Sequence, residues 1–253
     1  MPLLEAKHLG IAFGGLRALE DVNFKLEENQ IMGLIGPNGA GKTTVFNLLT
    51  GVYTPTEGTV ELEGKSIVGR KTYDITRNGI ARTFQNIRLF KDISVLDNVR
   101  IAMNSGMKYS LISGLLRLPS YWREEREVTD RAMELLDVFG LKNLSGSQAR
   151  NLPYGQQRKL EIARALACSP KVLLLDEPAA GMNPTETQEL METIKLIRDR
   201  FSIAILLIEH DMNFVMGICE HLIVLDYGRI IAEGSADEIR GNPKVITAYL
   251  GGE

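Results

Sequence analysis

The chain has 253 residues, of which 44% are hydrophobic and 24% are charged, and its formal net charge is −3. These values are typical of a soluble globular protein with a sizeable core, and they argue against a nucleic-acid-binding protein, which normally presents a basic face. The longest apolar runs, such as residues 203–208, are far shorter than the roughly 20 residues that span a bilayer. Residues 1–5 lack the basic and then apolar pattern of a signal peptide. We therefore expect the chain to reach a membrane only through a partner.

The two cysteines, Cys168 and Cys219, are far apart in the sequence, and no cluster of Cys and His at zinc-site spacing accompanies them. Disulfides belong to oxidising compartments. We therefore expect two buried, free thiols in a reducing cytoplasm.

The first third of the chain has the pattern of strands and turns. Residues 22–26 and 59–63 alternate apolar and polar side chains, which predicts half-exposed antiparallel strands. Ile31–Ile35 is almost wholly apolar, as expected of a strand buried on both faces. A glycine-rich turn at residues 36–41 separates this strand from a helix that we predict over residues 43–49.

The middle of the chain, residues 95–140, is predicted to be helical. Its best-defined apolar face consists of Val128, Ala132, Leu135, Leu136 and Phe139. Just before that face, residues 111–122 are apolar, are interrupted by Gly and Pro, and include the only Trp of the chain. Such a stretch forms either a small core of a helical lobe or an exposed docking surface for a partner, and the sequence leaves both open.

In the last third of the chain, buried strands alternate with helices. Residues 172–175, 203–208 and 222–225 are predicted strands, and Asn183 is the predicted N-cap of a helix. The buried face of that helix is expected to carry Leu190, Ile194, Ile197 and Phe201. This alternation implies a parallel sheet covered by helices, with the helical region of the middle inserted into an α/β domain.

Eight consecutive residues match the phosphate-binding pattern G-x-x-x-x-G-K-[ST] in full. They are Gly36, Pro37, Asn38, Gly39, Ala40, Gly41, Lys42 and Thr43. The glycines let successive backbone N–H groups surround a triphosphate, and the following helix presents its positive N-terminal end. Lys42 is expected on the β- and γ-phosphates, and the Thr43 hydroxyl is short enough to ligate Mg²⁺. With a buried strand before it and a helix after it, this pattern predicts nucleotide binding.

Two carboxylates follow the apolar strand at residues 172–175. Asp176 stands where it can hold Mg²⁺ through water, and Glu177 can polarise the attacking water as a general base. Acidic pairs after strands are often plain helix caps, but beside a phosphate loop the catalytic interpretation fits better. Gln85 and His210 also follow apolar runs, and their sequence surroundings alone assign them no role.

Residues 151–166 read N-L-P-Y-G-Q-Q-R-K-L-E-I-A-R-A-L and lie just ahead of the strand that ends in the two carboxylates. They resemble the ABC signature, usually L-S-G-G-Q, and its helix. The phosphate loop, Gln85, the signature, the carboxylates, Asn183 and His210 follow one another in the order of the ABC transporter nucleotide-binding domain. Essentially the whole chain resembles that family.

The resemblance implies a fold of the α/β class, a P-loop NTPase with a RecA-like parallel core, an N-terminal antiparallel β subdomain and an inserted α-helical subdomain. One ABC ATPase domain is expected over residues 1–253. Its catalytic core and antiparallel subdomain are expected at about residues 1–90 and 158–253, and its helical subdomain, ending in the signature, at about residues 91–157.

The resemblance also implies ATP and Mg²⁺ as ligands. Glu177, His210 and Gln85 are the expected catalytic residues, with His210 contacting the γ-phosphate and supporting Glu177. The expected metal-binding residues are Thr43, Gln85 and Asp176. Phe13 resembles the aromatic residue that stacks on adenine, although an ordinary core Phe is the alternative. The expected ATP-binding residues are Phe13, Ala18, Gly36, Pro37, Asn38, Gly39, Ala40, Gly41, Lys42, Thr43 and Thr44.

Two such domains are expected to pair head to tail, as a homodimer or a heterodimer of ABC ATPase subunits. The phosphate loop of one would then face the signature of the other across ATP. The expected contacts of the signature and of the D-loop are Leu152, Pro153, Tyr154, Gly155 and Gln156, and Asn183. The resemblance further implies that the helical subdomain binds transmembrane permease subunits. The chain would thus lie peripherally at the cytoplasmic face of the inner membrane, with a solute-binding protein as an indirect partner and no nucleic acid.

Pro153 and Tyr154 depart from the usual signature, in which Ser and Gly occupy these positions. Pro has neither a hydroxyl nor a backbone N–H, so the usual Ser contact to the γ-phosphate is in doubt, whereas the N–H groups of Gly155 and Gln156 remain available. Asn183 stands where the D-loop often has Asp. Residues 152–158 and 177–184 resemble the ATP-binding subunit of branched-chain amino-acid importers. So do residues 82–90, 208–212 and 248–251.

Three alternatives remain at this stage. The first is an ABC ATPase for another cargo, such as lipid or lipopolysaccharide export. The second is a soluble ABC ATPase that acts on DNA or the ribosome, which the single phosphate loop and the lack of a heptad tract or basic arm disfavour. The third is a non-catalytic nucleotide-binding regulator, which Glu177 and His210 disfavour.

Overall fold

The computed structural model describes residues 1–103 and 119–250. The strands are β1 Leu4–Phe13, β2 Leu16–Leu26, β3 Ile31–Ile35, β4 Glu57–Leu62, β5 Lys65–Ser66, β6 Ile80–Arg82, β7 Val172–Asp176, β8 Ala204–Ile208, β9 His221–Asp226 and β10 Arg229–Gly234. The helices are α1 Lys42–Leu49, α2 Thr72–Asn78, α3 Val95–Met103, α5 Pro119–Val138, α6 Tyr154–Leu166, α7 Pro184–Phe201, α8 Met212–Ile218, α9 Ala236–Arg240 and α10 Pro243–Leu250, with short 3-10 helices η2 Lys142–Leu144 and η3 Ala149–Asn151. None of the helices in these described ranges is both long enough and apolar enough to cross a bilayer.

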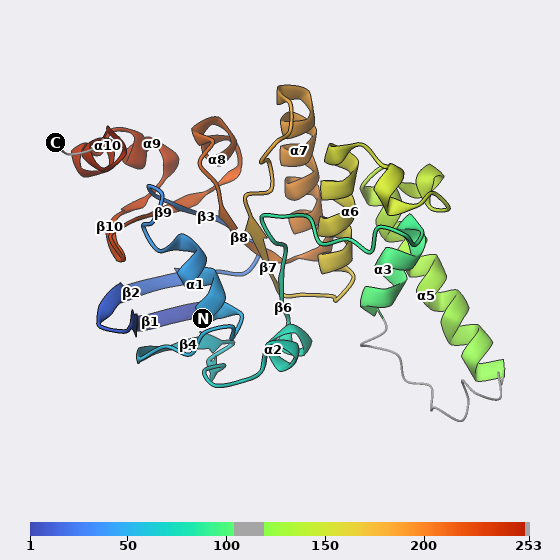
Figure 1. The fold of residues 1–253 in the computed structure, drawn as a ribbon, viewed down its shortest axis with the longest axis horizontal. Helices are drawn as coiled ribbons and strands as arrows, with labels where there is room; N and C mark the ends of the chain where they lie inside the picture. Colours follow the sequence, from blue (N-terminus) through green and yellow to red (C-terminus); the bar gives the residue numbers. More distant parts are fainter. Residues whose placement is uncertain (104–118, 251–253) are drawn as a thin grey trace. The chain divides into compact units, whose positions relative to one another are not determined.

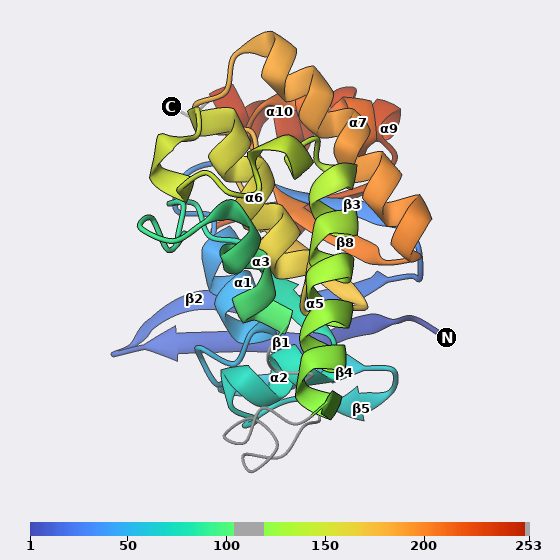
Figure 2. The same cartoon turned by 90° about the vertical axis from the view of Figure 1, so that its right-hand side faces the viewer.

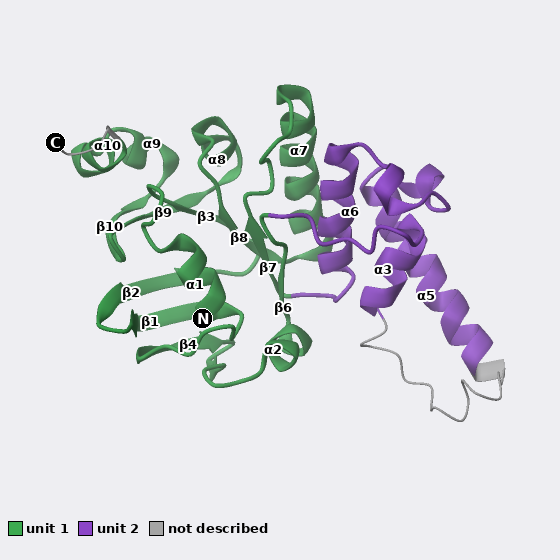
Figure 3. Cartoon of the chain, in the orientation of Figure 1, with its two compact units in different colours: residues 1–85, 171–253 green, residues 86–170 purple. Residues whose placement is uncertain are grey.

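The chain divides into two compact units, which Figure 3 colours separately. Unit 1 comprises residues 1–85 and 171–253, and unit 2 comprises residues 86–170. The chain leaves unit 1 after β6 and returns just before β7. Unit 2 starts earlier and ends later than the helical region expected at residues 91–157. It ends later because the helix α6 packs with α3 and α5.

Unit 1 contains two sheets (Figure 1). The smaller sheet has the strand order β2-β1-β4-β5, and each pair of neighbours is antiparallel. The larger sheet has the order β10-β9-β3-β8-β7-β6 and is parallel except for the pair β9 and β10. The predicted parallel core and antiparallel N-terminal part are thus confirmed, and the antiparallel edge strand β10 is an addition to the prediction.

The core of unit 1 lies between its two sheets. In both views α1 lies between the smaller and the larger sheet, while α7 lies on the opposite face of the larger sheet (Figures 1 and 2). One continuous cluster of buried side chains includes Leu9 of β1, Leu19 of β2, Phe46 of α1 and Leu206 of β8. Every residue of β3, β7 and β8 is buried, as their apolar sequences predict for strands covered on both faces.

The helix α7 begins where the sequence predicts and buries most of its expected face. Asn183 Oδ1 accepts the Glu186 N–H at 2.9 Å, and the Glu186 carboxylate accepts the Asn183 N–H at 3.0 Å. This reciprocal capping box, with Pro184 in the first position, fixes the start of the helix. The residues that share its buried face are Leu190, Ile194 and Ile197. Phe201 was predicted to join them and follows Ile197 at helical spacing, but it is the last residue of the helix and is 39% exposed, so the surface that covers this face ends before it.

The turn between β9 and β10 fastens the phosphate loop to β2. The Gly228 N–H donates to the Ala40 carbonyl at 2.9 Å, and the Gly228 carbonyl accepts the Glu20 N–H at 2.9 Å. Gly228 has φ +78°, and an added Cβ would lie 2.4 Å from the Ala18 carbonyl oxygen. Both the backbone conformation and the close approach therefore require glycine here.

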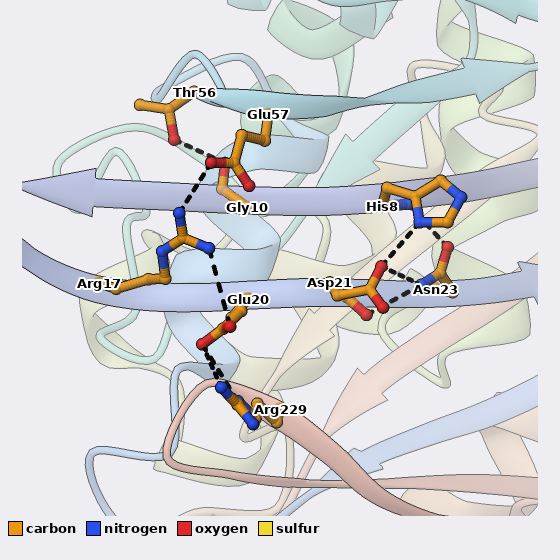
Figure 4. A network of polar contacts seen from close by, with 9 residues as sticks. All are labelled: His8, Gly10, Arg17, Glu20, Asp21, Asn23, Thr56, Glu57 and Arg229. Carbon is orange, nitrogen blue, oxygen red and sulfur yellow. Dashed lines mark hydrogen bonds and ion pairs between the residues drawn. The ribbon is translucent and has the colours of Figure 1, made fainter.

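Polar contacts on the smaller sheet connect strands that are distant in sequence (Figure 4). Arg17 of β2 pairs with Glu57 of β4 at 2.8 Å, and Arg229 of β10 pairs with Glu20 of β2 at 2.7 Å. These side chains are largely exposed, so each pair contributes less than about 1 kcal/mol to the free energy of unfolding. They link β2 to β4 across β1, and β2 to β10 of the larger sheet.

Unit 2 is helical, and its predicted apolar face is confirmed. Ala132, Leu135, Leu136 and Phe139 are buried and Val128 is half-buried. Of the apolar stretch predicted at residues 111–122, the part up to residue 118 lies outside the described residues. Trp122 of α5 is 55% exposed, and its ring stands edge-on to that of Tyr121, with centroids 5.3 Å apart.

Candidate functional site

The phosphate loop leads from the end of β3 directly into α1. Gly36, Gly39 and Gly41 have φ values of +147°, +81° and +106°. An added Cβ at Gly36 would lie 2.0 Å from the Leu225 carbonyl oxygen, so glycine is required there by space as well as by conformation. Gly41 is the N-cap of α1, and no side chain caps this helix. The first N–H groups of α1 and those of the loop therefore form a cradle for an anion.

Lys42 lies folded over this loop. Its Nζ donates to the Gly36 carbonyl at 2.6 Å and to the Pro37 carbonyl at 2.8 Å, and the side chain is buried. Burial lowers the pKa of the Lys42 ammonium, whereas the negative charges of Glu177 and Asp176 oppose that shift. The charges of Glu177 and Asp176 thus both act on the Lys42 ammonium. Of the next two predicted residues, Thr43 is exposed and Thr44 is half-buried.

Asp176 ends β7 and is paired with a residue that the sequence analysis gave no role. The Arg82 Nη2 donates to Asp176 Oδ2 at 2.7 Å, and both side chains are 6% exposed. The Arg82 Nη1 donates to Asn47 Oδ1 at 2.7 Å, and the guanidinium lies over the Phe46 ring, 5.3 Å from its centroid. In the sequence, Arg82 is recognisable only as an arginine that follows a short apolar run. Asp176 becomes its neighbour because β6 pairs with β7 in the folded sheet.

Two of the three predicted catalytic residues, Gln85 and His210, contact the third, Glu177. The Gln85 Nε2 donates to Glu177 Oε2 at 2.8 Å, and His210 Nε2 lies 3.2 Å from the same oxygen. Gln85, Glu177 and His210 follow the carboxyl ends of β6, β7 and β8, which are neighbours in the larger sheet. Parallel neighbours bring the residues after their carboxyl ends to one edge of a sheet, which explains the cluster. Glu177 itself has φ +48°, and its N–H donates to the Ile208 carbonyl at 2.9 Å.

Phe13 lies at the end of β1 and is 43% exposed, so it is not an ordinary core Phe. Its ring is edge-on to that of Tyr53, with centroids 5.2 Å apart and an interplanar angle of 70°. An exposed, laterally supported ring can stack on a planar base. Ala18 of β2 is partly buried against the core.

The C-terminal helix α10 also reaches the phosphate loop. Burial raises the pKa of the Tyr249 phenol, and the nearby Gly36 N–H opposes that shift. A cavity of about 740 Å³ lies between this helix and the loop, with Asp226 and Lys244 among its lining residues. The sequence analysis assigned no nucleotide-site contact to this helix.

The predicted signature residues lie in unit 2 at the start of α6. Pro153 is the N-cap, with φ −53° and ψ 154°, and no side chain caps the helix. Leu152 and Gly155 are buried, Tyr154 is 45% exposed and Gln156 is half-buried. The first backbone N–H groups of α6 are therefore not engaged by a capping side chain and can serve an anion.

The predicted metal-binding residues offer oxygen donors, which suit Mg²⁺. They are the Thr43 hydroxyl, the Asp176 carboxylate and the Gln85 amide oxygen. In the part of the chain that the structure describes, no group of three or more His, Cys, Asp or Glu is arranged to hold a metal ion. The three oxygen donors themselves fit a cation that takes its remaining ligands from phosphate and water, as Mg²⁺ does.

Two family profiles match the chain. Residues 19–180 match the family described as ABC transporter. Residues 229–253 match the family described as Branched-chain amino acid ATP-binding cassette transporter.

Curated relatives match over nearly the whole chain. The chain is 49% identical over 250 residues to the high-affinity branched-chain amino acid transport ATP-binding protein LivG of Salmonella typhimurium, covering 99% of this chain and 98% of that protein. It is 46% identical over 250 residues, with the same coverage, to the corresponding protein BraF of Pseudomonas aeruginosa. It is 34% identical over 251 residues, again with 99% and 98% coverage, to the lipopolysaccharide export system ATP-binding protein LptB of Escherichia coli.

Solved structures share the fold. The ADP conformation of MJ1267, an ATP-binding cassette of an ABC transporter, has a TM-score of 0.86 and 31% identity, covering 100% of both chains. A nucleotide-free ATP-binding cassette from an ABC transporter has a TM-score of 0.86 and 32% identity over the same coverage.

Proposed function

Since the chain belongs to the ABC transporter family, we propose that it is the subunit whose ATP hydrolysis powers the import of branched-chain amino acids. It is an ATPase of that family, and the cargo is the proposed part. The proposal is supported by 49% and 46% identity to two branched-chain amino acid transport proteins and by the match of residues 229–253 to the family of that name. No contact between these residues and an amino acid is implied, because the cargo is handled by other subunits.

The contact of Glu177 with Gln85 and His210 is the observation that carries the proposed chemistry. Glu177 polarises the attacking water, while Gln85 and His210 hold its carboxylate in position. Lys42 and the N–H groups of the phosphate loop bind the β- and γ-phosphates. Thr43, Gln85 and Asp176 hold Mg²⁺, which neutralises charge on the phosphates when it is bound.

The test of this function is transport. The chain would be reconstituted in proteoliposomes with its permease subunits and solute-binding protein, and uptake of labelled leucine would be followed with wild type and with Glu177→Gln. ATP-dependent uptake by wild type alone is expected. Lipopolysaccharide movement without leucine uptake would instead favour the second candidate, for which the 34% identity to LptB is the supporting observation.

Two ATPase subunits, identical or paralogous, would complete the site. The uncapped start of α6 offers N–H groups to the γ-phosphate of ATP bound by the other subunit, and Asn183 would lie at the same interface. Because Pro153 supplies neither a hydroxyl nor an N–H, Gly155 and Gln156 carry this contact through their backbone. Size-exclusion chromatography of Glu177→Gln with ATP and Mg²⁺ should show a dimer that disappears when ADP replaces ATP; a monomer under both conditions would contradict a homodimer.

Permease subunits would hold the chain at the cytoplasmic face of the inner membrane through unit 2. Trp122 is the described part of the candidate docking surface and is 55% exposed. Trp122→Ala should weaken co-sedimentation with permease-containing vesicles and leave ATP binding unchanged. Tyr73→Ala, which removes a ring that is also 55% exposed but belongs to unit 1, is the matched control. Equal co-sedimentation of both variants would place the docking surface elsewhere.

A further inference from the structure

Glu209 is a buried carboxylate just after β8, and it accepts backbone N–H groups from two loops. Its side chain is 2% exposed. Oε1 accepts the Ala179 N–H at 2.8 Å, and Oε2 accepts the His210 N–H at 3.1 Å. The Asp211 N–H lies near enough to lower the pKa of this carboxyl. One side chain thus satisfies donors in the loop after β7 and in the loop after β8.

These two loops carry the groups that we assign to hydrolysis. Ala179 comes two residues after Glu177, and His210 comes directly after Glu209. The Glu177 and His210 side chains meet at 3.2 Å. The two segments are therefore joined by the side chains of the proposed catalytic pair, by the bond from the Glu177 N–H to the Ile208 carbonyl, and by the buried carboxylate of Glu209.

Glu209 differs in its partners from Glu161 of unit 2, the other buried glutamate among the described residues. Glu161 pairs with the Arg158 guanidinium at 2.8 Å and accepts one main-chain N–H, from Arg88 at 3.0 Å, whereas Glu209 accepts main-chain N–H groups from two different loops. Burial raises the pKa of the Glu209 carboxyl, and the three N–H groups oppose that shift. A buried carboxylate is costly to place, but bonds to main-chain atoms fix the paths of the loops themselves.

We propose that Glu209 is a positioning residue for ATP hydrolysis, which sets the separation of Glu177 and His210 by holding the Ala179 and His210 backbone. The inference rests on the proposed roles of Glu177 and His210. Placement matters at this scale, because a displacement of about 1 Å in a catalytic group can cost about a hundredfold in rate.

The first experiment measures ATP hydrolysis and ATP affinity of Glu209→Gln in the full chain. The Gln side chain has nearly the same size, but its Oε1 is its one acceptor atom and its Nε2 would face an N–H donor. We expect kcat to fall about tenfold or more and KM and ATP affinity to change little, while Tm falls by a few degrees because one buried N–H loses its acceptor. Glu238→Gln is the matched control, since Glu238 also accepts a backbone N–H, from Ser235 at 2.7 Å, but in the cap of α9. Wild-type kcat in Glu209→Gln would overturn the inference.

A double-mutant cycle with His210→Ala separates positioning from general structural support. If Glu209 acts through His210, adding Glu209→Gln to His210→Ala should lower kcat by less than twofold more. Losses that multiply in the double variant would mean that Glu209 acts elsewhere, and the inference would fall. Amide hydrogen exchange gives a direct readout, because Ala179 and His210 should exchange faster in Glu209→Gln than in wild type.

If Glu209→Gln does not fold, Glu209→Asp tests the positioning role of Glu209 instead. It retains the charge but is one methylene shorter, so it cannot hold the donors of both loops at once, and a fall in kcat is again expected. Wild-type turnover by Glu209→Asp would contradict the inference. Wild-type hydrolysis by Glu177→Gln would contradict the proposed role of Glu177 as the general base. An inactive Glu177→Gln together with a fully active Glu209→Gln would contradict only the role of Glu209.

Discussion

In unit 1 the buried charged side chains Lys42, Asp176 and Glu209 lie at the first residue of α1, at the last residue of β7 and directly after β8, whereas in unit 2 the buried pair Arg158 and Glu161 lies within the helix α6. The unit 2 pair is satisfied inside the fold, because Glu161 also accepts the Arg88 N–H at 3.0 Å. In unit 1, Lys42 folds over a loop that can hold an anion, and the charge of Asp176 acts on it. On the proposed roles, buried charge serves the reaction in unit 1 and the architecture in unit 2.

The largest expected effect tests the reactive half of this comparison. Glu177→Gln should lower kcat for phosphate release by about a hundredfold to ten thousandfold, because it removes the general base. ATP binding should persist, since the phosphate loop is unchanged. Glu192→Gln, an exposed glutamate of α7, is the control, and equal turnover by both variants would mean that another residue activates the water.

Arg158→Met tests the architectural half. It should lower the free energy of unfolding by about 3–5 kcal/mol, because the Glu161 carboxylate would stay buried without its cation. Denaturant titration measures this loss, and Arg158→Met combined with Glu161→Leu should recover much of it. If the single variant were as stable as wild type, the pair would not be the support that its burial indicates.

Arg82→Met sharpens the comparison, because this pair is buried in unit 1 but belongs to the site. We expect a smaller loss of stability, about 2 kcal/mol, because the charge of Lys42 still acts on the unpaired Asp176. Hydrolysis should also slow, since the carboxylate loses its fixed orientation. Arg17→Met, which breaks an exposed pair, should cost less than about 1 kcal/mol. An Arg82 variant that loses stability but keeps full turnover would make Arg82 purely structural.

Lys42→Ala should weaken ATP binding by about tenfold to a hundredfold, as expected for the loss of charge-assisted hydrogen bonds worth about 1.5–3 kcal/mol. Isothermal titration calorimetry measures the affinity. The thermal unfolding of the variant should stay close to that of wild type, because the bonds of Lys42 are to its own loop. Unchanged ATP affinity would remove the assignment of the phosphate loop.

The smallest effect concerns the two thiols, one in each unit. Burial raises the pKa of both thiols, and the rise is large for Cys219. The positive charge of Arg164 opposes the shift at Cys168. Iodoacetamide at about pH 8.5 should therefore label Cys168 faster than Cys219 in the folded protein, as mass spectrometry can show. Because both thiols hold their protons more tightly when folded, stability should fall as the pH rises above the ordinary thiol pKa of about 8.5. Equal labelling rates would contradict the difference in burial, since Cys219 is buried, whereas Cys168, which was also predicted to be buried, is half-buried.

Much of the fold follows from local patterns in the sequence. The continuous apolar runs at Ile31–Ile35 and residues 172–175 predicted strands buried on both faces, and they form β3 and the start of β7. The cap at Asn183 was legible because its partners are three residues away or fewer. Phe201 was misjudged because periodicity does not say where the covering surface ends.

The site was predictable as a set of residues but not as a set of contacts. Lys42 and Glu177 are marked by motifs whose chemistry is local. Arg82 and Glu209 are not, because their partners, Asp176 and Ala179, are 94 and 30 positions away and become neighbours only through strand order. A single sequence carries no signal for such pairs beyond an unusual charge beside an apolar strand.

The glycine turn at Gly228 acts as a fixed spacer in the nucleotide site. One residue is bonded at 2.9 Å both to Ala40 in the phosphate loop and to Glu20 in β2, the strand that carries Ala18. The strand that carries Ala18 and the phosphate loop are therefore tied to one and the same residue. An insertion in this turn would break one of the two bonds, and the two parts of the proposed nucleotide site would then be free to move apart.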